Sequence, residues 1–146
     1  MLTESTKWVI GISLTLVGFF VVHLLALHRQ KEAARTEAAK KLMSVVTSEL
    51  SEIYPISSAW PENIDGYLRS KFPALQSAVE AYKPYAKNKA EFERAWKIHR
   101  VGEEGREIDK QVYHQYMGFQ IDNEPRIVPE SQLKENIDRL LSHAKT

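Results

Sequence analysis

One apolar stretch, residues 8–27, constrains this chain most, because WVIGISLTLVGFFVVHLLAL contains no Asp, Glu, Lys or Arg. A helix of about twenty residues rises about 30 Å, which matches the hydrocarbon core of a bilayer. A backbone in lipid must satisfy its own hydrogen bonds, so the stretch is expected to be helical throughout. Trp8 stands where an interfacial aromatic side chain belongs, after a short N-terminal tail of residues 1–7. The sequence therefore predicts a transmembrane helix over residues 8–27.

A cleaved signal peptide is the alternative interpretation of this stretch. Such a peptide has an apolar segment of about 7–15 residues and ends in a small-x-small cleavage site. Here the segment is longer, ends in LLALHRQK and runs directly into basic residues. These differences favour an uncleaved signal anchor in a single-pass membrane protein.

Basic side chains gather directly after the apolar stretch, whereas only Lys7 precedes it. The positive-inside rule therefore predicts that the C-terminal domain lies in the cytoplasm. The same side chains are candidates for contact with anionic lipid headgroups at the membrane surface. These residues are Arg29, Lys31, Arg35, Lys40 and Lys41.

Small residues recur on one face of the predicted transmembrane helix. Gly11, Thr15 and Gly18 are spaced at i, i+4 and i+7, which resembles the stripe that lets two membrane helices approach closely. The alternative is that glycine is simply common in membrane helices. The stripe makes these three residues the candidates for helix association.

The residues after the membrane stretch predict a basic neck helix over 28–53. Alanines and long charged side chains favour a helix, and Leu42, Val46, Leu50 and Ile53 draw one apolar stripe. No Gly or Pro intervenes before Pro55, so the neck is expected to continue the membrane helix without a break. Prolines and serines then predict a linker over residues 54–62.

The remaining chain, residues 63–146, predicts a small helical domain. Short helices are expected over 63–70 and from Pro73 to Pro84, where proline should stop or kink the second one. Asn88 opens the next helix as an N-cap, and Gly102 closes it. The stretch 101–128 predicts a long, partly ordered loop, and a final amphipathic helix follows Pro129. The expected fold class is all-α: a membrane helix, a continuous neck and a small bundle.

One segment of this domain resembles known proteins. The residues FPALQSAVEAYKPYAKNKAEFERAWKIHR, with Tyr82-x-Pro84-Tyr85 and Phe92-x-x-Ala95-Trp96, resemble a set of uncharacterised small bacterial proteins. The ending SQLKENIDRLLSHAK is similar to theirs as well. The resemblance implies a bacterial inner-membrane protein with a basic helical neck and a compact all-helical domain. It implies no activity, because that set has none assigned.

Few features of the sequence point to chemistry. There is no cysteine, and no two histidines share the i, i+4 spacing of a helical metal pair, so neither a metal nor a cofactor is expected. The net charge is +1 and the basic side chains gather beside the membrane stretch, which argues against a nucleic-acid partner. The best polar-aromatic constellation is a candidate groove for a ligand or partner. It comprises Trp96, Asp109, Tyr113, His114 and Tyr116.

The favoured interpretation is a membrane-anchored helical interaction or scaffold module that is not an enzyme. Its expected partners are the lipid bilayer and either a second copy or another membrane protein. The alternative is a membrane-tethered sensor or regulatory domain that binds a small molecule near Trp96, Tyr113 and His114. An interaction module should expose an apolar patch or pair with itself, whereas a sensor should enclose a pocket with convergent polar groups.

Overall fold

The computed structural model describes residues 3–105, 112–118 and 128–145, and over these ranges the chain is helical with no strand. This confirms the all-α prediction for the described residues. The chain divides into two compact units, Met1–Ala34 and Arg35–Thr146. The first helix, α1 (Glu4–Glu49), contributes to both units.

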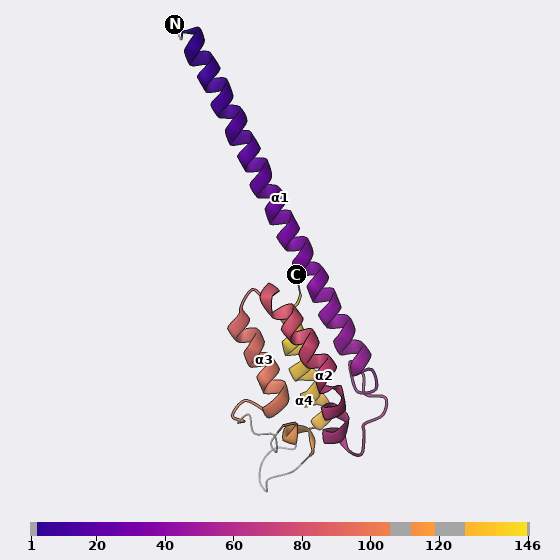
Figure 1. Cartoon of the computed structure of the whole chain (residues 1–146). Helices are drawn as coiled ribbons and strands as arrows, with labels where there is room; N and C mark the ends of the chain where they lie inside the picture. The colour runs from indigo at the N-terminus through magenta and orange to yellow at the C-terminus, as the bar shows by residue number, and fades with distance from the viewer. Residues whose placement is uncertain (1–2, 106–111, 119–127, 146) are drawn as a thin grey trace. The chain divides into compact units, whose positions relative to one another are not determined.

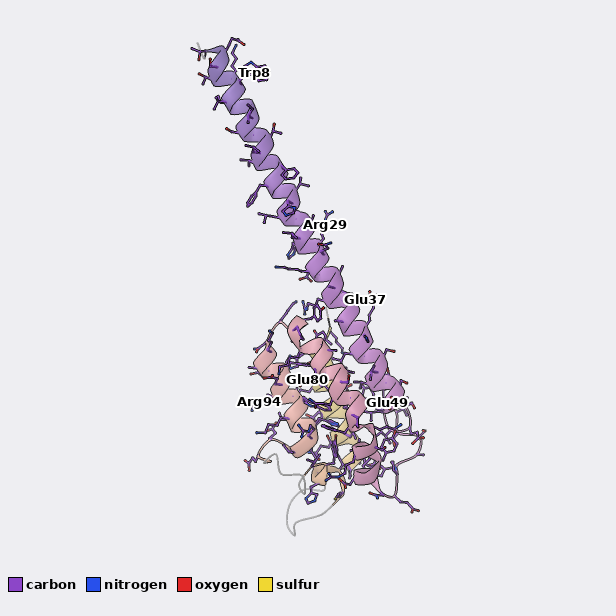
Figure 2. The ribbon with its side chains drawn as sticks, in the orientation of Figure 1. Trp8, Arg29, Glu37, Glu49, Glu80 and Arg94 are labelled. Carbon is purple, nitrogen blue, oxygen red and sulfur yellow. The ribbon has the colours of Figure 1, made fainter. Side chains whose placement is uncertain are left out.

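In the first unit, α1 carries the apolar stretch with its side chains exposed along the helix. Trp8 lies near the start of this part and Arg29 near its end (Figure 2). Glu4 stands in the first turn, where a carboxylate is favoured by the helix dipole, and it accepts a 2.9 Å hydrogen bond from Lys7. The helix is long and apolar enough to cross a membrane, a criterion that a signal sequence or a soluble core helix also meets.

The second unit is a bundle of helices around one core (Figure 1). Residues 35–49 of α1 form its first element. The others, in chain order, are α2 (Ile64–Tyr82), the 3-10 helix η1 (Lys83–Tyr85), α3 (Lys89–Val101), the 3-10 helix η3 (His114–Tyr116) and α4 (Pro129–Ser142).

Hydrogen bonds fix the direction in which α2 packs within the second unit. The Tyr67 hydroxyl, in the first turn of α2, donates to the carbonyl of Glu49 at the end of α1 over 3.2 Å. At the other end of α2, the Tyr82 hydroxyl donates to the carbonyl of His143, just after α4, over 2.8 Å. Helix α2 therefore runs antiparallel to residues 35–49 and parallel to α4, so its C-terminal end lies at the end of the bundle where Arg35 begins.

The core of the bundle follows the apolar periodicities of the sequence. The predicted stripe of Leu42, Val46, Leu50 and Ile53 is buried, and α2, α3 and α4 each add a buried face. The largest aliphatic and aromatic side chains with almost no exposure are Leu42, Leu50, Ile53, Leu68, Leu75, Tyr82, Phe92, Tyr113, Tyr116, Leu133, Ile137 and Leu140. The cap at Asn88 is confirmed, since its side chain accepts from the Glu91 N–H over 3.2 Å.

Two predicted boundaries are wrong. Helix α1 ends at Glu49 rather than near Ile53, although Ile53 still reaches the core through a turn closed by its N–H and the Leu50 carbonyl at 2.9 Å. Helix α2 is one helix, not two, and carries Pro73 inside it. Proline removes one hydrogen bond of the helix, and burial of Leu75 and Val79 immediately after it offsets that loss.

The predicted linker over 54–62 is anchored to the bundle at its first residue. Tyr54 is buried, and its hydroxyl donates to the Asp138 carboxylate on α4 over 2.7 Å. The predicted loop over 101–128 is described only in part. Its described residues include η3, and the prediction for 106–111 and 119–127 lies outside the described residues.

Candidate functional site

A buried polar network joins α3, η3 and α4. The Tyr116 hydroxyl lies 2.9 Å from His99 Nδ1, donates to the His99 carbonyl over 2.9 Å, and accepts from Asn136 Nδ2 over 2.9 Å. All three side chains are at most 5% exposed. When the hydroxyl proton goes to the carbonyl, the hydroxyl accepts from a proton on Nδ1, which sets the tautomer of a neutral His99. Each helix thus contributes one member to a network that holds the three elements in register.

Gln115 completes this network at the end of α3. Its Nε2 donates to the carbonyls of Ile98 and His99 over 2.7 Å and 2.8 Å. These carbonyls lie in the last turn of α3, where the helix leaves acceptors without partners of its own. Gly102 ends the helix with a φ of 80°, a left-handed conformation that glycine adopts without a Cβ penalty. The glutamine therefore caps α3 from the short helix η3.

The backbone at Tyr113 turns the chain into this interior. Its φ of 64° is left-handed, and its N–H donates to the carbonyl of Arg100 over 2.6 Å. The Tyr113 ring then lies 5.6 Å from the His99 ring, which is 5.4 Å from the Trp96 ring. An aromatic residue with positive φ is rare, and the burial of its ring is what holds it there.

The electrostatics of the cluster keep its groups neutral. Burial, with a smaller effect from the Arg100 charge, lowers the pKa of His99 to about 3. Burial also raises the pKa of Tyr113 to about 12, and it raises the pKa of Tyr116. A histidine that stays neutral far below pH 7 is poorly matched to acid–base catalysis near neutrality. The arrangement suits the joining of helices.

The residues of the predicted groove fall into two environments. Trp96, Tyr113 and Tyr116 are brought together and buried, and Trp96 Nε1 donates to Gln76 Oε1 on α2 over 2.7 Å. His114 instead lies on the surface. Asp109 lies outside the described residues. The aromatic part of the prediction therefore corresponds to interior packing between helices.

His99, Gln115 and Asn136 are the members of the network that the predicted groove lacked. His99 stands on the apolar stripe of α3, and Asn136 stands beside Ile137 on the buried stripe of α4. A polar residue on an apolar stripe needs a buried partner, and that pattern is the signal that could have found both. Among the described residues, no group of three or more His, Cys, Asp or Glu could hold a metal ion.

The basic residues after the apolar stretch also differ in environment. Arg29 and Lys31 are exposed in the first unit, and Lys40 and Lys41 are exposed in the second. Arg35 is only 7% exposed, so it packs within the second unit. Four of the five candidates for headgroup contact therefore keep exposed side chains.

The small-residue face of α1 lies open in the first unit. Gly11 and Thr15 line a shallow groove together with Trp8 and Leu16. The Thr15 hydroxyl donates to the Gly11 carbonyl over 2.9 Å, so it needs no external partner in an apolar surrounding. A Cβ built at Gly11 or at Gly18 meets nothing within 4 Å, so the space beside both glycines is free.

Over the part of the chain that the structure describes, these features define an all-helical protein with one helix of membrane-spanning length and a bundle closed by a neutral polar network. No family model matches the sequence, and comparison with curated proteins and with solved structures gives no significant match. The resemblance to small bacterial membrane proteins therefore stays a prediction.

Proposed function

We propose that the chain is a single-pass inner-membrane protein whose helical domain lies in the cytoplasm and works as a non-enzymatic interaction module. The observation that carries this proposal is the exposure of the apolar stretch. None of residues 8–27 is buried, and Trp8, Phe19 and Phe20 are 72%, 74% and 62% exposed. Burying such surface is strongly favourable, and a bilayer is the cover that matches its length.

Continuity of the membrane helix with the neck is part of the proposal. It is supported by the unbroken course of helix α1 from Glu4 to Glu49, which includes the basic residues after the apolar stretch. Cytoplasmic placement is supported by Arg29 and Lys31, which follow the stretch with exposed side chains.

An interaction module is favoured over a small-molecule sensor because the aromatic cluster is closed. Trp96, Tyr113 and Tyr116 are at most 6% exposed and pack on one another and on His99. A ligand beside them would have to displace side chains that hold α3, η3 and α4 together.

Membrane insertion and orientation are tested with single cysteines, since the native chain has none. Ser5→Cys and Ser142→Cys report on the two sides of the apolar stretch, in the full chain expressed in bacteria. We expect the protein to stay in the membrane pellet after alkaline carbonate, with residue 5 labelled by an impermeant maleimide in intact spheroplasts. Residue 142 should react only after lysis. Release by carbonate, a shortened N-terminus, or the reverse labelling would contradict the proposal.

The interaction role is tested by photo-cross-linking in native membranes. Ile56 is 79% exposed and Met43 is 37% exposed, and both are apolar positions on the surface of the domain. A photoreactive side chain at either position should give discrete cross-linked bands, with the exposed polar position Ser77 as control. Recovery of no partner at either position, not even a second copy, would argue against an interaction module.

A further inference from the structure

The turn between α2 and α3 presents one aromatic and two basic side chains at the surface. Tyr85, at the end of η1, is 42% exposed, and Lys87 and Lys89 follow it with exposed side chains. Ala86, between them, is buried and anchors the turn in the core. The segment therefore holds its exposed residues outward on a fixed base.

The lysines of this turn differ in their ion pairs. Lys83 forms ion pairs with Glu93 and Glu80, which raise its pKa. Lys87 and Lys89 form no ion pair with any described residue. Their positive charges are therefore available to an external anion.

The turn lies at the end of the bundle that contains Arg35, the first residue of the second unit. Because α2 runs antiparallel to residues 35–49, its C-terminal end lies level with Arg35. The bond from Tyr82 to His143 brings the end of α4 to the same place, and Lys145 is exposed there. The exposed carboxylate nearest to Lys87 and Lys89 along the chain is that of Glu91, which offsets part of their positive charge.

The short connection to the apolar stretch limits how far this end can be from a bilayer. Residues 28–34 lie between the stretch and the second unit. As a helix they span about 10 Å, and fully extended they span at most about 25 Å. This limit applies to Arg35, the first residue of the second unit. The helical span of about 10 Å is comparable to the Debye length of about 8 Å at physiological salt, whereas the fully extended span exceeds that length.

We propose that the turn of Tyr85, Lys87 and Lys89 contacts the anionic phospholipid surface of the membrane. This inference rests on the proposed membrane anchoring. A tyrosine ring suits the headgroup level, where its apolar body and polar hydroxyl are both accommodated. The ammonium groups of Lys87 and Lys89 attract anionic headgroups beside it. The domain is thereby held against the bilayer by a second point of contact besides its helix.

The test places a fluorophore at residue 85 of the full chain in nanodiscs. Tyr85→Cys carries an environment-sensitive dye, and Ser58→Cys, at an exposed position in the linker, is the control. In discs that contain phosphatidylglycerol, we expect a blue shift and quenching by headgroup-labelled nitroxide lipid at residue 85 but not at residue 58. In pure phosphatidylcholine, the effect at residue 85 should weaken.

Charge variants then test the lysines. K87Q and K89Q in the Tyr85→Cys background should weaken contact about fivefold for each lysine removed. The matched control is R94Q with K97Q, two exposed basic residues farther along α3, which should leave quenching unchanged. An equal loss of quenching in the K87Q/K89Q variant and in the R94Q/K97Q variant would overturn the assignment of the lipid contact to this turn.

The remaining outcomes separate this inference from the anchoring itself. A chain that stays inserted in the disc but shows the same signal at residues 85 and 58 overturns the contact alone. A chain that does not insert overturns the proposed function. A probe at residue 85 that is shielded in native membranes but not in anionic discs identifies a protein partner and overturns the lipid contact.

Discussion

Tyr116 on η3 and Asn136 on α4 are joined by a 2.9 Å hydrogen bond, and the hydroxyl that accepts it also contacts His99 on α3. Three segments far apart in the sequence therefore depend on one buried oxygen atom. Removing a single member of such a network leaves the others desolvated without partners, which costs more than the bond itself contributes.

The first prediction is that Tyr116→Phe destabilises the domain. The change removes the hydroxyl and leaves Asn136 Nδ2 without this acceptor, so the free energy of unfolding should fall by about 1–3 kcal/mol. Urea unfolding of the full chain in micelles, followed by near-ultraviolet circular dichroism, measures this loss. Tyr85→Phe, which removes an exposed hydroxyl, is the control and should change stability by less than about 0.5 kcal/mol. Equal effects of the two variants would mean that the network does not stabilise the fold.

The second prediction concerns acid. The pKa of His99 is lowered by burial, from 6.5 to about 3, so the unfolded chain binds a proton at this residue more readily than the folded chain. The contribution of neutral His99 to the free energy of unfolding is therefore fully present above pH 6.5 and is lost as the pH falls toward 3. Linkage gives a loss of about 2 kcal/mol between pH 7.5 and pH 5.

The control for the acid prediction is His99→Gln, which has no titratable group at this position. Its stability should change less with pH over the same window, whatever its absolute stability. Asp138 does not interfere, since the hydrogen bond from Lys134 lowers the pKa of its carboxyl below 3.8 and places its titration at lower pH. Parallel curves for the two proteins between pH 7.5 and 5 would show that His99 is not the group responsible.

Local periodicity was sufficient to predict α3 and α4. Phe92, Trp96 and His99 follow the helical repeat and are buried, and the Asn88 cap formed where its spacing predicted. The predicted helix break before Pro73 was wrong because the burial of apolar side chains on both sides of the proline outweighs the local tendency of proline to end a helix. Leu68 lies before the proline and Leu75 after it, and both are buried on one face of a single helix.

The polar network could be predicted only in part, for a physical reason. Whether His114 or Tyr116 points inward depends on the left-handed backbone at Tyr113, and neither glycine nor asparagine marks that conformation in the sequence. The partnership of Asn136 with Tyr116 depends on how α4 packs against η3, which residue spacing does not encode.

The third prediction is that residues 35–49 of α1 belong to the folded core of the domain. Leu42 is 1% exposed and packs in the same core as α2 and α4, so Leu42→Ala should lower the free energy of unfolding by about 2–5 kcal/mol. Met43→Ala, at the neighbouring and 37% exposed position, should cost much less. Urea unfolding of both full-length variants in micelles decides this. Equal midpoints would show that this part of α1 is a tether and not a core element.

The fourth prediction concerns the face of α1 that carries Gly11, Thr15 and Gly18. If two copies associate through this face, Gly11→Leu with Gly18→Leu should weaken association by on the order of tenfold, because large side chains keep the backbones apart. The space around both glycines is open, so the substitutions themselves leave the helix unstrained. Ser13→Leu places a leucine on the opposite face of the helix and is the control. Energy transfer between differently labelled full-length chains in bilayers measures association, and equal transfer in all variants would exclude this face as the contact.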